Sequence, residues 1–427
     1  MADAFETTDG NVPFGMITGN FDLTKRQSTT GNPMLKQSSL SSKLKRAGIK
    51  TLPQEKKMET DPLWKGPESD DPQGGITQSM MDGLLSCRVR AKIALIDGLR
   101  STEGFNKNLE YGNLWHICEE ALAAKKDWLG PLQKYAQKLA RKYPLQQTEA
   151  IKWYEVCKRQ FPVYIDYWRK HPDVKERTPL LQEEAFKLPY ALPSGRIVYL
   201  RGKFDSVDLI GKGKSAGIYL QENKTKGDID EATLQKNLTF DKQTMFYLVA
   251  LEIHKEIYLQ DAPPDPGYAK EWEAPLRGVR YNVIRRPLSG GRGSIRPHAA
   301  KQTGRGFTPA ESDAHYYDRL LNDYILAEPE YWFMRWTVDV TKSDIERYKT
   351  EFLDPFLENV CWWYDLQVGN KVHVSEFDLN CLHYRLPYGV YSPIAEGYET
   401  DQDNFLRTGS TVGLERAETL FPELEES

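Results

Sequence analysis

The sequence predicts a mixed α/β domain in which one central mixed β-sheet is flanked by helices, with a helical N-terminal part and further helices towards the C-terminus. Three observations predict this. The apolar spacing is helical over residues 77–169, it changes to a strand-like pattern over 184–223, and helices and strands alternate from residue 238 onward. This order of elements is typical of one sheet covered by helices.

The helical part begins at residues 77–96, where the apolar side chains recur on one face of a helix. These side chains are Met80, Met81, Leu84, Leu85 and Val89. Three further helices are predicted at 109–124, 131–142 and 147–169.

Strands follow at 184–191, 196–210 and 215–223, and turn residues separate them. The turns are Pro193-Ser194-Gly195 and Gly211-Lys212-Gly213. The remaining elements are predicted as a helix at 238–259, a strand at 278–284, a helix at 310–326, a strand at 331–340 and a helix at 343–364.

The two ends differ in composition from the domain between them, which spans 77–395. Residues 1–76 are rich in proline and small polar residues, so they are predicted to form a disordered tail. Phe14, Phe21 and Trp64 could instead be docking points for a partner. Residues 396–427 carry nine acidic residues against two arginines and are predicted to be an acidic C-terminal tail.

Overall composition excludes some classes of protein. No apolar run approaches the length of a membrane span, and residues 1–10 lack the pattern of a secretory signal. Five scattered cysteines favour a reduced setting, so we expect a cytoplasmic protein. The net charge of −4 argues at first against a nucleic-acid partner.

Residues that could carry chemistry lie at the ends of the predicted strands. Asp205 lies in a strand otherwise suited to burial, where a carboxylate is costly unless it is paired or bound to a metal. The next strand ends in Glu222-x-Lys224, and residues two apart on a strand point to the same face. Two carboxylates and one ammonium group then converge, which suits Mg²⁺ and a phosphate substrate. An acid-x-Lys triplet alone occurs roughly five times by chance in such a chain, so its strand context gives it weight.

Two helices add candidate polar groups. Gln243 and Tyr247 are four residues apart, so they lie on one face of the helix that follows the strands. His116 lies in an early helix, where a lone histidine is more often a packed or surface residue than a ligand.

Four short motifs occur in chain order: G-x-x-x-H at Gly112 and His116, G-x-x-D at Gly202 and Asp205, E-x-K at Glu222 and Lys224, and Q-x-x-x-Y at Gln243 and Tyr247. This set resembles the RecB-type branch of the PD-(D/E)XK nuclease superfamily, which includes phage exonuclease-like proteins. The resemblance covers about residues 77–395 and implies a restriction-endonuclease-like core.

The resemblance implies Mg²⁺- or Mn²⁺-dependent cleavage of DNA, exonuclease-like and of a phage type, in recombination, repair or processing. It implies that His116, Asp205 and Glu222 hold the metal, that Lys224 orients or activates the water, and that Gln243 and Tyr247 position the lysine or the DNA. By analogy, a single-strand annealing or other recombination protein would be a partner. Two alternatives stay open, a catalytically silent DNA-binding or assembly protein that keeps the fold, and RNA as the substrate.

Asp208 lies three residues beyond Asp205 and therefore faces the other side of a regular strand, so a structural role is favoured over metal ligation. The cysteines also depart from the pattern of many relatives, which hold an iron–sulfur cluster with four cysteines. Only Cys87, Cys361 and Cys381 are available, at unsuitable spacing, and Leu386 stands where a relative has cysteine. We therefore expect no cluster.

A basic stretch at residues 277–305 holds eight lysines and arginines and no acidic residue. It includes a predicted loop insertion at 285–309, rich in glycine, which suits phosphate contacts better than a merely solvated loop. The predicted DNA contacts are Arg280, Arg285, Arg286, Arg292, Arg296, Lys301 and Arg305. The near-neutral total charge therefore averages a basic stretch against an acidic tail and does not exclude DNA.

Overall fold

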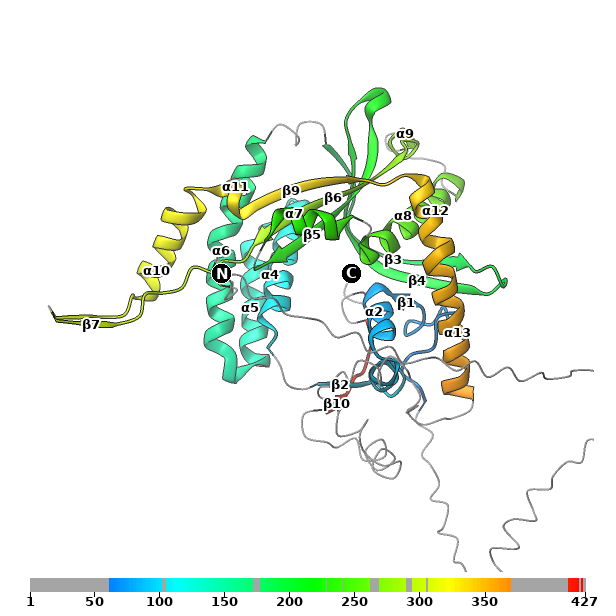
Figure 1. Cartoon of the computed structure of the whole chain (residues 1–427), viewed down its shortest axis with the longest axis horizontal. Coiled ribbons are helices and arrows are strands. Elements are labelled where there is room, and N and C mark those ends of the chain that lie inside the picture. The colour runs from blue at the N-terminus through cyan, green and yellow to red at the C-terminus, as the bar shows by residue number, and fades with distance from the viewer. Residues whose placement is uncertain are drawn as a thin grey trace, which may run out of the picture. The chain divides into compact units, whose positions relative to one another are not determined.

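The computed structural model describes residues 61–101, 105–171, 177–227, 229–239, 241–261, 269–288, 294–304, 306–369, 414–421 and 424. Its centre is a six-stranded mixed sheet with helices packed against it (Figure 1). The predicted fold class is confirmed.

The sheet is built around β4, which pairs antiparallel with β3 and β5 and parallel with β1. Strand β5 pairs parallel with β6, and β6 pairs antiparallel with β9. The parallel pair requires a crossover, which α7 (Glu231–Leu238) and α8 (Lys242–Asp261) supply. The strands are β1 (Ile76–Thr77), β3 (Arg177–Ala191), β4 (Ile197–Ile210), β5 (Gly217–Lys226), β6 (Leu276–Arg285) and β9 (Phe333–Asp339).

Three helices form one flank of the sheet, namely α4 (Lys107–Ala123), α5 (Leu129–Lys142) and α6 (Gln147–Lys170). Their shared core is rich in aromatic rings. The Trp115 ring lies 5.2 Å from the ring of Phe161 and 5.1 Å from that of Tyr164, which in turn reaches Phe333 of β9 at 5.4 Å. This aromatic cluster fixes α4 and α6 against the sheet.

A second core covers the other face, where α8 packs against β3, β4, β5 and β6. The helices α2 (Gln78–Ser86) and α12 (Lys342–Tyr348) contact α8. The chain continues from α12 through the π-helical turn η6 (Lys349–Leu353) into α13 (Asp354–Gly369).

The helix predicted at 77–96 is interrupted. The hydroxyl of Thr77 caps α2, but Cys87 is extended with φ −163° and ψ 110°, so the helix ends there. The chain resumes as α3 (Arg88–Ala91) and the π-helical turn η1 (Lys92–Ile96).

Several short elements were not predicted. The hairpin β7 (Lys301–Thr303) and β8 (Gly306–Thr308) lies in the predicted loop insertion and projects away from the sheet (Figure 1). It precedes the helix predicted at 310–326, which the structure shows as α10 (Asp313–Arg319) and the π-helical turn η5 (Leu320–Ile325). The short helix α11 (Pro329–Trp332) follows and was not predicted. The other short elements are the 3₁₀ turns η2 (Pro144–Gln146) and η4 (Gly213–Ser215), and α9 (Ala269–Trp272).

Parts of both predicted tails belong to the folded unit. Trp64 is fully buried, its indole N–H donates to the carbonyl of Gly75 at 2.7 Å, and its ring lies 5.1 Å from Tyr364. Near the C-terminus, β10 (Leu414–Arg416) pairs with β2 (Leu99–Ser101), and the buried ring of Phe421 lies 4.0 Å from the guanidinium of Arg201. Residues 1–60, with Phe14 and Phe21, lie outside the described residues.

The cysteines differ in state. Cys118, Cys157 and Cys361 are free and buried. Cys87 is buried and disulfide-bonded, which differs from the reduced thiols that the sequence predicted. Cys381 and Leu386 lie outside the described residues. In the part of the chain that the structure describes, no helix is long and apolar enough to cross a membrane.

Candidate metal centre

The candidate site lies where β4 and β5 separate. The ladder between these strands ends at the pair Ser206 and Gln221, and Asp205 and Glu222 are the next residue on each strand. Asp205 stays tied to β5, because its Oδ2 accepts the backbone N–H of Asn223 at 2.8 Å. The two predicted carboxylates therefore lie at the opening between neighbouring strands.

Lys224 links this opening to α8. Its Nζ donates to Glu222 Oε2 at 3.0 Å and to Gln243 Oε1 at 2.6 Å. One helical turn later, Tyr247 packs edge-on against Phe186 and Phe204. The E-x-K motif of β5 and the Q-x-x-x-Y motif of α8 are therefore in direct contact through Lys224 and Gln243.

Gly202 explains the first position of the G-x-x-D motif. A Cβ at this residue would lie 2.7 Å from Phe186 Cζ and 3.0 Å from Tyr247 Cε1, which is too close for an ordinary contact. Only glycine lets these rings pack over β4 beside Asp205.

His116 reaches the same opening from α4. A Cβ at Gly112, one turn earlier, would lie 3.6 Å from Thr225 Oγ1, so this helix runs close to β5. The Nδ1 atom of His116 lies 3.6 Å from Asp205 Oδ1. All four motifs are therefore brought together around one point.

Glu183 is a fourth candidate ligand, and the sequence did not predict it. Its Oε1 lies 3.7 Å from His116 Nδ1, and ligand atoms of His116, Glu183 and Asp205 all lie within 4.8 Å of one another. Its backbone has φ +49°, a left-handed conformation that is costly for a residue with a side chain. A Glu-Glu pair at the start of a predicted strand was the available signal, but the pattern could not reveal the backbone turn that directs Glu183 towards Asp205.

The hydrogen bonding of these carboxylates fits a cation. Glu183 Oε2 lies 3.2 Å from Lys203 Nζ, but its Oε1 is buried without a hydrogen-bond donor among the described residues. The same holds for Glu222 Oε1. Buried oxygens without donors are unfavourable unless a positive charge satisfies them. Carboxylate oxygens with one imidazole suit a hard divalent ion such as Mg²⁺ or Mn²⁺.

The pKa values of these side chains also favour binding of a cation. Burial raises the pKa of Glu222 to about 7 despite the opposing effect of Lys224, and burial also raises the pKa of Asp205. Burial alone would lower the pKa of His116, but the nearby Asp205 and Glu183 raise it to about 9. Without a cation the site therefore retains protons, which a divalent ion would displace.

Asp208 is engaged elsewhere. Its Oδ2 lies 2.8 Å from Arg177 Nε and its Oδ1 accepts a hydrogen bond from Ser206 Oγ at 3.1 Å. Asp208 is fully buried, so this ion pair holds β3 to β4 and leaves Asp208 outside the candidate site.

The predicted DNA-binding residues do not form one exposed surface, and Arg285, predicted at the start of the loop insertion, is the last residue of β6. Arg280 and Arg285 belong to β6 and are only 3% and 4% exposed, because this strand lies between β5 and β9. Arg286 is half-buried, and its Nη1 donates to the carbonyl of Asn108 at 3.2 Å, at the start of α4. Arg296 and Lys301 are exposed, whereas Arg292 and Arg305 lie outside the described residues.

A comparison with protein-family models decides the family. The model of the PD-(D/E)XK nuclease superfamily matches residues 76–330 of the chain, more than half of its length. The chain belongs to the PD-(D/E)XK nuclease superfamily. Members of this superfamily are generally nucleases and typically use Mg²⁺ or Mn²⁺. A search of curated proteins finds no match.

The superfamily match contains every candidate residue of the site. It begins at β1, includes α4 with His116 and the strands with the acidic residues, and extends past α8 with Gln243 and Tyr247. Strand β9 and the C-terminal helices lie beyond it.

Proposed function

We propose that this chain is a Mg²⁺- or Mn²⁺-dependent DNA nuclease of the RecB-type branch, exonuclease-like and acting in phage-type DNA recombination, repair or processing. One observation carries the proposal, namely the convergence of Asp205, Glu222 and Lys224 at the opening between β4 and β5, with His116 beside them. Its place of action would be the cytoplasm, that of the host cell if the chain is viral. A recombination protein such as a single-strand annealing protein would be a fitting partner.

Four side chains are suited to hold the ion: His116, Asp205 and Glu222, with Glu183 as an addition from the structure. When bound, the ion supplies charge neutralisation at the scissile phosphate and a more acidic water. Asp205 and Glu222 are held in place by their own strands, so little reorganisation is required when the ion and the DNA arrive.

Lys224 is held by Glu222 on one side and by Gln243 on the other, which fixes its ammonium group at the edge of the site. From there it would orient the attacking water or a phosphate oxygen. The pKa of Tyr247 is raised by burial, so its hydroxyl stays protonated. Its oxygen accepts a hydrogen bond from the side chain of Gln243, and its O–H can donate one to the DNA backbone.

The basic segment after β6 would contact the DNA backbone. Arg286 lies beside the start of α4, the helix that carries His116, and Arg296 and Lys301 extend outward from there. Arg292 and Arg305 belong to the same stretch of sequence. Arginine and lysine contacts to phosphates would give affinity that falls as salt rises.

The direct test uses labelled linear and circular DNA, incubated with the full chain in Mg²⁺ or in EDTA. We expect Mg²⁺-dependent products from the wild-type chain and none from Glu222→Gln. Products from linear DNA alone indicate an exonuclease, and products from both indicate an endonuclease. DNA binding without products would favour the silent DNA-binding alternative, and Mg²⁺-dependent cleavage of RNA but not DNA would change the substrate.

A further inference from the structure

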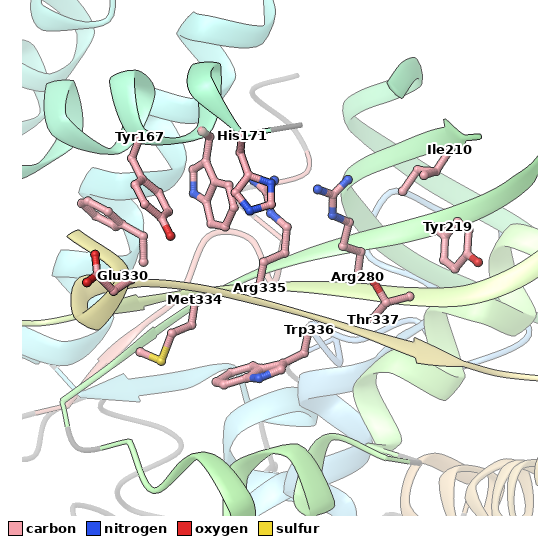
Figure 2. A pocket seen from close by; sticks show the side chains of 12 residues that line it. Tyr167, His171, Ile210, Tyr219, Arg280, Glu330, Met334, Arg335, Trp336 and Thr337 are labelled. Carbon is pink, nitrogen blue, oxygen red and sulfur yellow. The ribbon is translucent and has the colours of Figure 1, made fainter. Parts of the chain in front are cut away.

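A second candidate site lies in a cavity of about 420 Å³ between the end of α6 and the strands β6 and β9 (Figure 2). This volume lies within the range of small-molecule sites, roughly 300–1,000 Å³. Its walls include the aromatic residues Tyr167 and Trp168, and His171, which follow one another at the end of α6. Nothing in the proposed nuclease reaction uses this cavity.

Two arginines enter the cavity from neighbouring strands. Arg335 of β9 pairs with Asn282 of β6, two residues beyond Arg280, so the two arginine side chains project from the same face of the sheet. The guanidinium of Arg335 lies 3.5 Å from the ring centre of Trp168. Arg280 is 3% exposed and lines the same cavity.

Burial and a neighbouring positive charge disfavour the charged form of each guanidinium, with Arg335 acting on Arg280 and Arg177 acting on Arg335. Burial and the charge of Arg335 lower the pKa of Arg280 to about 9, and burial also lowers the pKa of Arg335. A bound anion would favour the charged forms of both side chains. Arginine pairs of this kind suit a phosphate, because each guanidinium offers a fork of donors.

Flat apolar surfaces lie beside the arginines. The rings of Tyr167 and Trp168 are 4.8 Å apart, and the Tyr167 ring is 5.9 Å from Phe333 of β9. Figure 2 shows Tyr167 and Glu330 on one side of the cavity, Ile210 and Tyr219 on the other, and His171, Arg335 and Arg280 between them. Aromatic rings can stack on a nucleobase, and a carboxylate can accept hydrogen bonds from its amino group.

The cavity is separated from the candidate metal centre by the sheet. Lys224 of β5 pairs with Val283 of β6, three residues beyond Arg280, and an odd separation along a strand places side chains on opposite faces. A ligand beside Arg280 would therefore not be the group that is cleaved at Glu222 and Lys224.

We propose that this cavity is a non-catalytic site for a single nucleotide, with its phosphate at Arg280 and Arg335 and its base against the ring of Tyr167 on α6. The choice of a nucleotide over other aromatic anions rests on the proposed nuclease function. The same chemistry is available from a free deoxynucleoside monophosphate or from the phosphorylated end of a DNA strand.

The proposal is tested by equilibrium dialysis of the full chain in EDTA, which prevents cleavage. The probes are dAMP, deoxyadenosine, inorganic phosphate and a short 5′-phosphorylated oligonucleotide. We expect dAMP to bind more tightly than deoxyadenosine or phosphate, since only dAMP contacts both ends of the site. A stronger signal from the oligonucleotide identifies a strand end as the source of the nucleotide. Absence of dAMP binding to the wild-type chain at millimolar concentration overturns the proposal.

Substitutions of single arginines test whether dAMP binds in this cavity. Arg280→Met should weaken dAMP binding about tenfold or more, because a charge-assisted contact is lost while the apolar stem is kept. Arg277→Met alters an exposed arginine on the same strand and should leave binding unchanged. Circular dichroism checks that both variants fold. Equal binding by wild type and a folded Arg280→Met overturns the assignment.

The metal-site variant Glu222→Gln separates this proposal from the nuclease function. It should still bind dAMP in EDTA, because its substitution lies on the other side of the sheet. DNA cleavage by a wild-type chain that does not bind dAMP leaves the nuclease proposal standing and removes this one. Binding of dAMP by a wild-type chain that does not cleave DNA supports the nucleotide site and counts against the nuclease proposal.

Discussion

Two regions on opposite sides of one sheet show opposite electrostatics. At the opening between β4 and β5, acidic side chains gather and burial raises the pKa of Asp205 and Glu222. In the cavity beside α6, two arginines gather and burial lowers the pKa of Arg280 and Arg335. Like charges brought together inside a protein disfavour each other. Each region is therefore suited to a ligand of opposite charge, a cation at the acidic side chains and an anion at the arginines.

The two regions also differ in how they are assembled. The arginine cavity takes both guanidiniums from the register of two regular strands. The acidic region needs an irregular backbone, because Glu183 has a positive φ and the β4–β5 ladder ends at Ser206. Strained backbone and the end of a ladder are features that recur at functional sites.

Substitutions in the acidic region should lower nuclease activity more than any other change. Asp205→Ala, Glu222→Ala and Lys224→Ala should each lower Mg²⁺-dependent DNA cleavage at least about a hundredfold, because positioning and charge neutralisation are lost. Gel-resolved product formation measures this. Lys214→Ala, on the exposed turn before β5, is the control and should keep full activity. Full activity of Lys224→Ala would remove the proposed role of that lysine.

Glu183 provides the next test, since it belongs to the acidic region only if it contacts the ion. Glu183→Gln should raise the Mg²⁺ concentration needed for half-maximal activity roughly tenfold or more, because one charged ligand is lost. Titration of Mn²⁺ by calorimetry measures the same effect without DNA. Glu184→Gln, the neighbouring residue whose carboxylate is half-exposed and lies near His254, is the matched control. Identical titrations for the two variants would place Glu183 outside the metal centre.

The acidic region should also make the stability of the metal-free chain depend on pH. Glu222 has a pKa raised to about 7 and His116 one raised to about 9, so the folded, metal-free chain binds protons more tightly than the unfolded chain. Its stability should therefore fall as pH rises from about 5 to about 9. Thermal unfolding in EDTA should show a falling Tm over this range, with a smaller fall in Glu222→Gln.

Added Mg²⁺ should reduce this loss of stability, since the ion replaces the displaced protons. A metal-free Tm that rises from pH 6 to pH 8 would contradict the raised pKa values of Glu222 and His116.

The smallest effect concerns the exposed basic residues, which differ from the buried arginines of the cavity. Arg296→Ala and Lys301→Ala should each weaken DNA binding by a few fold and reduce the slope of log affinity against log salt by about one. Fluorescence anisotropy at several salt concentrations measures this in EDTA. Lys134→Ala, an exposed lysine on α5, should leave the slope unchanged. An unchanged slope in all three variants would favour the alternative that the basic segment is a solvated loop without DNA contacts.

Much of the fold followed from local patterns. The strands around Asp205 and Glu222 and the helices around His116 and Gln243 were predicted because their periodicity reflects burial of one face. The pattern failed where structure depends on distant partners. Trp64 was assigned to a tail, although it packs against Tyr364, three hundred residues away in the sequence. Short pairings such as β2 with β10 have no periodicity of their own to detect.

The fold class and the motif residues could be predicted from the sequence, because hydrophobic spacing and residue chemistry are local properties. The tertiary structure was needed to show that Glu183 approaches Asp205 and that Arg280, in the predicted strand, lines a cavity. Both outcomes depend on strand register and backbone conformation, which are fixed when separate elements pack together. A side chain's charge can be read from the sequence, whereas the face of the sheet on which it lies is set by the fold.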